Sequence, residues 1–154
     1  EVLNYLDILE ETFLIKTIRP FYRNKNKELV KVPKIYFIDS GVRNYFINNF
    51  NESRLRGDFG YLFEGFVLSE LIKKGKEEIK FWQNKNKQEV DFVMEGKEII
   101  PIEVKFKDNL KPDDEIGLKV FLEEYKLKEG YLINFSAQER KGKISFILPF
   151  NLDF

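Results

Sequence analysis

Three charged side chains interrupt two short apolar runs near the middle of the chain. The first run, residues 88–94, carries Asp91, and the second, residues 99–106, carries Glu103 and Lys105. A charge beside Val, Ile and Phe costs free energy unless it is paired or binds a ligand. Two carboxylates and a lysine are the groups required for metal-assisted hydrolysis of a phosphodiester. The acids hold a hard divalent ion, while the lysine orients a water molecule, helps to deprotonate it or stabilises developing negative charge.

Strand alternation predicts how the two runs face each other. The apolar side chains of the first run are expected on one face: Val90, Phe92 and Met94. A three-residue turn at 96–98 places Phe92 opposite Ile102, and therefore Asp91 opposite Glu103. A two-residue turn would pair apolar with charged positions instead. The pattern thus brings both carboxylates and Lys105 to one place on the predicted sheet.

The same spacing has two simpler interpretations. Charged residues make up 34% of the chain, and the outward face of a strand often carries a solvated ladder of Glu, Asp and Lys. The charges could also form a structural ion-pair cluster without a ligand. An Asp followed by Glu-x-Lys does not by itself distinguish these interpretations from a metal site.

Composition excludes several kinds of chemistry. The chain has no Cys and no His, which rules out thiol or histidine catalysis and Cys- or His-ligated metals within it. Its 26 basic and 26 acidic residues balance, so net charge does not indicate a partner. No phosphate-binding G-x-x-x-x-G-K-[ST] motif occurs. No apolar run approaches the roughly 20 residues that span a bilayer, and we expect a cytoplasmic protein without membrane contact.

Apolar periodicity and turn residues predict the order of elements. Helices are expected at 2–10, 39–48, 58–74 and 113–124, and strands at 12–18, 32–38, 79–83, 88–94, 99–106, 129–135 and 143–148. The short connections between 79 and 106 predict an antiparallel meander, and the helix at 113–124 allows a parallel fourth strand. The fold class expected is α/β, bordering on α+β, with a mixed sheet. Residues 1–50 are expected to form a partial winged-helix-like segment, and residues 51–154 the main domain.

Three groups of residues together resemble a known superfamily. They are the helix motif 63–71 (Phe-Glu-Gly-Phe-Val-x-x-Glu-Leu), residues 88–93 around Asp91, and residues 100–105 with Glu-x-Lys. This combination resembles the PD-(D/E)xK nucleases, and more narrowly the C-terminal domain of an archaeal and bacterial family of AAA+-type ATPases. The upstream stretches 5–15 and 31–41 agree with the winged helix of that family. The resemblance implies a restriction-endonuclease-like αβββαβ core.

The resemblance also assigns roles to residues. Asp91, Glu103 and Glu64 match the metal-binding acids, and Lys105 matches the motif lysine, so these four are the expected catalytic residues. The Pro of the superfamily's Pro-Asp pair is replaced by Val90. The implied function is Mg²⁺- or Mn²⁺-dependent phosphodiester hydrolysis on DNA by a nuclease-like domain of an ATPase. The alternative is a catalytically silent accessory domain that binds nucleic acid or protein.

Two basic clusters would contact the phosphates of a nucleic acid. The residues expected to do so are Arg19, Arg23, Lys25, Lys27, Lys31, Lys85 and Lys87. The expected partners are DNA and an ATPase domain upstream in the same protein, and a homo-oligomer is left open. No residue for binding an organic cofactor is expected.

Overall fold

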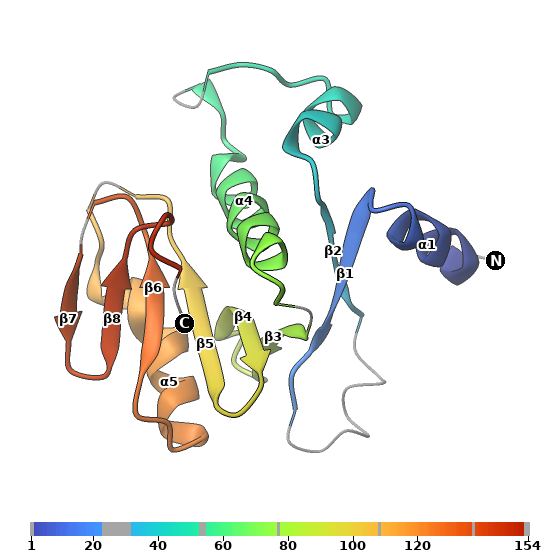
Figure 1. The fold of residues 1–154 in the computed structure, drawn as a ribbon. Coiled ribbons are helices and arrows are strands. Elements are labelled where there is room, and N and C mark those ends of the chain that lie inside the picture. Colours follow the sequence, from blue (N-terminus) through green and yellow to red (C-terminus); the bar gives the residue numbers. More distant parts are fainter. Residues whose placement is uncertain are drawn as a thin grey trace.

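The computed structural model describes residues 2–22, 32–52, 55–76, 78–107, 109–136 and 138–152. Within them, eight strands form one mixed sheet in the order β2-β1-β3-β4-β5-β6-β8-β7 (Figure 1). Helices α4 and α5 contribute to the apolar cores on its two faces. The expected α/β class with a mixed sheet is confirmed. No helix within the described ranges is long and apolar enough to cross a bilayer.

The centre of the sheet follows the predicted order of elements. The sequence of elements is α4 (Phe59–Lys73), β3 (Ile79–Gln83), β4 (Glu89–Glu95), β5 (Ile99–Val104), α5 (Ile116–Glu124) and β6 (Gly130–Ile133). The three strands β3, β4 and β5 form the predicted antiparallel meander, and β6 lies parallel to β5. The 3₁₀ turn η2 (Pro112–Glu115) precedes α5, so the helix begins later than residue 113.

The N-terminal elements join the same sheet. They are α1 (Val2–Glu11), β1 (Ile15–Pro20), β2 (Lys34–Phe37) and α3 (Ser40–Phe46). The strands β1 and β2 form an antiparallel hairpin, and β1 also pairs in parallel with β3. The division expected at residue 50 therefore does not interrupt the sheet.

The other edge of the sheet holds β8 (Ile144–Ile147) and β7 (Glu139–Lys141). The strand β7 was not predicted. All three of its residues are charged and exposed, so no apolar alternation marks it in the sequence.

The core divides into two apolar layers, one on each face of the sheet. The layer on the α4 side includes Phe63, Val67, Leu71, Phe92 and Ile102. The layer on the α5 side includes Phe21, Trp82, Leu118, Phe121 and Phe146. Trp82 is 1% exposed and lies in edge-to-face contact with Phe121, so it is a core residue.

A bulge in β4 breaks the alternation expected there. Lys80 pairs with Val93 and Trp82 with Val90, so two steps along β3 match three along β4. The predicted common face for Val90, Phe92 and Met94 is therefore wrong. Phe92 and Met94 lie in the α4-side layer, whereas Val90 lies with Val93 in the α5-side layer. Bulges of this kind re-aim side chains, and this one lies at Asp91.

Ion pairs fix the segment that leads into α4. Arg56 Nη2 lies 2.9 Å from Asp58 Oδ2, and Arg43 Nη1 of α3 lies 2.8 Å from the same oxygen. These contacts tie α3 to the residue before α4. At its other end α4 stops at Gly75, whose φ of 76° suits glycine and few other residues.

Helix α5 begins against the backbone of β4. A Cβ atom at Gly117 would lie 2.0 Å from the carbonyl oxygen of Glu89. Backbone cannot move aside cheaply at this point, because it belongs to the sheet. The absence of a side chain at Gly117 therefore sets the distance between α5 and the strand that carries Asp91.

We expect Gly117→Ala to destabilise the protein by about 1–3 kcal/mol, the usual cost of overpacking a well-packed contact. Chemical denaturation would measure the change in the free energy of unfolding. Gly65→Ala is the matched control, because the added Cβ has nothing within 4 Å and lies inside α4. It should raise stability by about 0.5–1 kcal/mol through helix propensity. Equal effects at the two positions would contradict the close approach at Gly117.

Candidate active site

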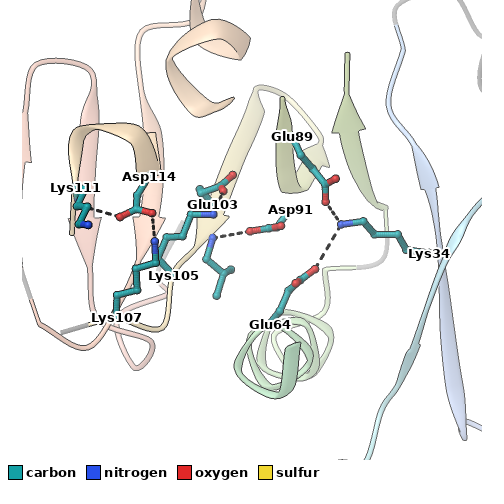
Figure 2. Close-up of polar contacts among 10 residues, drawn as sticks. Lys34, Glu64, Glu89, Asp91, Glu103, Lys105, Lys107, Lys111 and Asp114 are labelled. Carbon is teal, nitrogen blue, oxygen red and sulfur yellow. Dashed lines mark hydrogen bonds and ion pairs between the residues drawn. The ribbon is translucent and has the colours of Figure 1, made fainter. Parts of the chain in front are cut away.

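Two buried carboxylates lie on neighbouring strands at one end of the sheet. The β4–β5 ladder pairs Phe92 with Ile102 and turns through residues 96–98, as predicted, so Asp91 and Glu103 come next in register. Asp91 is 8% exposed and Glu103 5% exposed. The Oδ2 atom of Asp91 accepts a hydrogen bond from the backbone N–H of Val104 at 2.8 Å (Figure 2).

Burial and mutual repulsion make both acids reluctant to ionise. Burial raises the pKa of Asp91 well above its usual range, and the negative charges of Glu103 and Glu64 raise it further. Burial raises the pKa of Glu103 to about 7, although the ion pair with Lys105 opposes the rise. Two carboxyl groups with raised pKa values that share a site are typical of functional centres.

Lys105 lies beside Glu103 and forms an ion pair with its Oε1 atom. Burial alone would lower the pKa of Lys105, but the carboxylates of Glu103 and Asp91 raise it above its usual value. The ammonium group is therefore charged at neutral pH. The second oxygen of Glu103, Oε2, is buried and has no hydrogen-bond partner among the described residues.

Glu64 approaches the pair from α4, yet the N-terminal hairpin holds its carboxylate. The Tyr36 hydroxyl donates a hydrogen bond to Oε1 of Glu64, and Lys34 Nζ lies 3.6 Å from the same oxygen. Lys34 also forms an ion pair with Glu89, whose other oxygen accepts from Gln83 Nε2 at 3.0 Å. Figure 2 shows Lys34 between Glu64 and Glu89, across from Lys105.

Asp91 and Glu103 are the pair that fits a hard divalent cation. A buried carboxylate oxygen without a partner, next to a second carboxylate, is what such an ion would satisfy. Within the described part of the chain, no group of three Asp or Glu residues lies close enough together to hold a metal by itself. Water and a substrate oxygen would have to complete the coordination, as they commonly do for Mg²⁺.

The basic residues expected to contact nucleic acid are only partly placed. Arg23, Lys25, Lys27 and Lys31 lie outside the described residues. Lys85 and Lys87 are exposed in the turn between β3 and β4, at the end of β4 nearer to Asp91. Arg19 is exposed on β1, where it pairs with Lys80 of β3.

Several charged and polar residues that surround Asp91 and Glu103 were not among the site residues predicted from the sequence. Lys34 and Tyr36 share a strand face by alternation, which was the available signal. On the other side, Lys107 forms an ion pair with Asp114, and Asp114 accepts from the backbone N–H of Lys111 at 2.9 Å. No spacing in the sequence marks this pair, because η2 positions Asp114.

The fold and the acid pair define an α/β domain with a candidate metal-binding site on the central strands β4 and β5. The family described as "Domain of unknown function (DUF4143)" matches residues 59–152, and the chain belongs to it. Residues 1–53 match a second domain of unknown function, DUF8612. Domains of the DUF4143 family accompany AAA-type ATPases, in agreement with the association expected from the sequence. No curated protein and no solved structure matches the chain.

The raised pKa of Glu103 makes a prediction about stability in metal-free buffer. Between its ordinary pKa of 4.5 and about 7, folded Glu103 holds a proton that the unfolded chain releases. Stability therefore falls as pH rises through this range. Glu103→Gln cannot ionise, so it should lose less stability between pH 5 and pH 8 than the wild type. The difference should be on the order of 2 kcal/mol, measured by urea denaturation with EDTA present.

Glu98→Gln is the control, because Glu98 is exposed in the turn between β4 and β5. It removes the same charge and should keep the pH dependence of the wild type. A pH dependence unchanged in Glu103→Gln would show that Glu103 ionises normally in the folded protein.

Proposed function

We propose that this domain hydrolyses phosphodiester bonds in DNA with Mg²⁺ or Mn²⁺. The observation that carries the proposal is the pair of buried carboxylates, Asp91 and Glu103, beside Lys105. One oxygen of Glu103 has no hydrogen-bond partner in the described part of the chain. Burying two adjacent acids is unfavourable for a protein unless a cation compensates them. The element order αβββαβ and the Glu-x-Lys spacing on β5 support a PD-(D/E)xK, restriction-endonuclease-like assignment.

Asp91 and Glu103 would hold the ion, and Glu64 would lie beside them. When bound, the metal would polarise the phosphate and acidify a coordinated water molecule. Asp91 is oriented for this role by the N–H of Val104, which fixes one of its oxygens. Both carboxyl groups must be deprotonated to hold the ion, so their raised pKa values in the metal-free protein mean that metal binding would release protons.

The charged state of Lys105 selects among the roles expected for it. A protonated ammonium cannot deprotonate water, so Lys105 would donate a hydrogen bond to the attacking water or to a phosphate oxygen. Lys105 directly follows β5, which carries Glu103, and its ion pair with that carboxylate keeps it within reach of anything bound there.

DNA is the proposed substrate because exposed lysines flank the acids. Lys85 and Lys87 lie in the turn before β4, and the half-exposed Lys107 follows β5. Such side chains supply sequence-independent affinity for phosphates. The association of the family with AAA-type ATPases supports an ATPase domain of the same protein as a partner.

Calorimetry with Mn²⁺ and Mg²⁺, followed by cleavage of plasmid and single-stranded DNA, tests the proposal. Asp91→Asn should weaken metal binding at least about tenfold and reduce cleavage at least about a hundredfold. Lys105→Met should bind the metal at least as tightly as the wild type, because it removes a positive charge beside Glu103, but it should lose cleavage to a similar extent because the hydrogen-bond donor is gone. Glu95→Gln is the control, since Glu95 lies at the opposite end of β4 and forms an ion pair with Lys80.

The combination of readouts separates the alternatives. Metal binding without cleavage would indicate a silent domain or one controlled by its ATPase. Absence of metal binding at millimolar concentration, in wild type and control alike, would contradict the nuclease proposal and leave an interaction domain.

A further inference from the structure

A second lysine reaches the acid cluster from the side opposite Lys105. Lys34 begins β2 and extends across the sheet, with its ammonium 5.2 Å from the centre of the Phe81 ring on β3. From there it forms an ion pair with Glu89 of β4 and lies 3.6 Å from Oε1 of Glu64. Its side chain is 28% exposed, so most of its water shell has been replaced by these contacts.

The position of Lys34 is reinforced by its neighbour on the same strand face. Tyr36 donates a hydrogen bond to the same oxygen of Glu64 and packs its ring 6.0 Å from that of Phe92. Oε1 of Glu64 is thus held by two side chains of β2.

The acid cluster has more negative than positive charges. Four carboxylates make up the acid cluster: Glu103 and Glu64 raise the pKa of Asp91, and Glu89 and Glu64 raise that of Glu103. Two ammonium groups, those of Lys34 and Lys105, lie among them. With every group ionised, the sum is two negative charges, which one divalent ion neutralises. Without Lys34 the deficit would be three.

We propose that Lys34 is a built-in counter-cation that occupies the Glu64–Glu89 side of the acid cluster and competes with metal ions there. The site would then take one divalent ion, at Asp91 and Glu103, rather than two. This inference rests on the proposed function and concerns the regulation of the same site. It assigns to the N-terminal hairpin a direct influence on metal loading.

The competition follows from electrostatics. A fixed positive charge within about 8 Å of a divalent ion, at an effective dielectric constant near 20, weakens binding at least tenfold. The coupling is reciprocal, so a bound metal weakens the hold of Lys34 on the acids to the same degree. Any partner that draws the Lys34 side chain away from the acids would therefore raise metal affinity.

The test is Mn²⁺ calorimetry on the full chain, with four proteins compared: wild type, Lys34→Met, Lys34→Arg and Lys16→Met. Lys34→Met should bind Mn²⁺ at least tenfold more tightly, whereas Lys34→Arg keeps the charge and should stay near wild type. Lys16→Met is the matched control, because Lys16 lies in the same hairpin but pairs with Glu10 of α1 at 3.0 Å. Its affinity should change less than twofold.

A melting-temperature cycle in EDTA provides a readout that does not depend on metal. It combines Lys34→Met, Glu64→Gln and the double variant. If Lys34 neutralises Glu64, the double variant should melt higher than the sum of the two single shifts indicates. Additive shifts in melting temperature would contradict the role of Lys34 as a counter-cation.

The outcomes also distinguish this inference from the proposed function. Equal or weaker binding by Lys34→Met, in a protein whose wild type binds Mn²⁺, would overturn the competition and leave the metal site standing. Binding by Lys34→Met alone would support the competition in its strongest form. No Mn²⁺ binding by either protein would contradict both the metal site and the competition. The melting-temperature cycle in EDTA would then show by itself whether Lys34 neutralises Glu64.

Discussion

Two carboxylates buried side by side impose the main physical constraint on this structure. Unit charges about 5 Å apart repel by roughly 3 kcal/mol at an effective dielectric constant near 20, and burial adds the cost of lost hydration. The chain compensates in part with the N–H of Val104 and the ammonium groups of Lys105 and Lys34. The raised pKa values of Asp91 and Glu103 reflect the part of the cost that these groups leave uncompensated. The hairpin, α4 and the central strands all contribute groups to this one cluster.

Backbone irregularities place the acids where they meet. The bulge in β4 lets Val90 pack toward α5 and Phe92 toward α4, with Asp91 at the step between them. Gly117 brings the start of α5 onto the carbonyl group of Glu89, two residues before Asp91. If β4 had no bulge and α5 lay one methyl group further from it, much the same sheet would form. The carboxylate of Asp91 would then occupy a different position.

Much of the fold followed from local patterns in the sequence. The strand at 79–83 has the predicted bounds, and the turn at 96–98 set the register of Phe92 with Ile102. The misplacement of Val90 and the unforeseen β7 have different causes. A bulge depends on tertiary packing, whereas a strand of three exposed charges leaves no apolar signal. The contacts of Lys34 could not be predicted from the sequence either. Glu89 is 55 positions away, and Lys34 reaches it only when the hairpin packs beside β3.

The parallel pairing of β1 with β3 ties together the two segments that match separate families. If the chain were cut between residues 53 and 59, β3 would become an edge strand with unpaired backbone groups. Phe21 would leave the α5-side layer, and its contacts with Phe121 and Tyr125 would be lost. Exposed edges of this kind are templates for association between chains. The N-terminal segment therefore covers this edge of β3, and a fragment that begins at the family boundary would expose it.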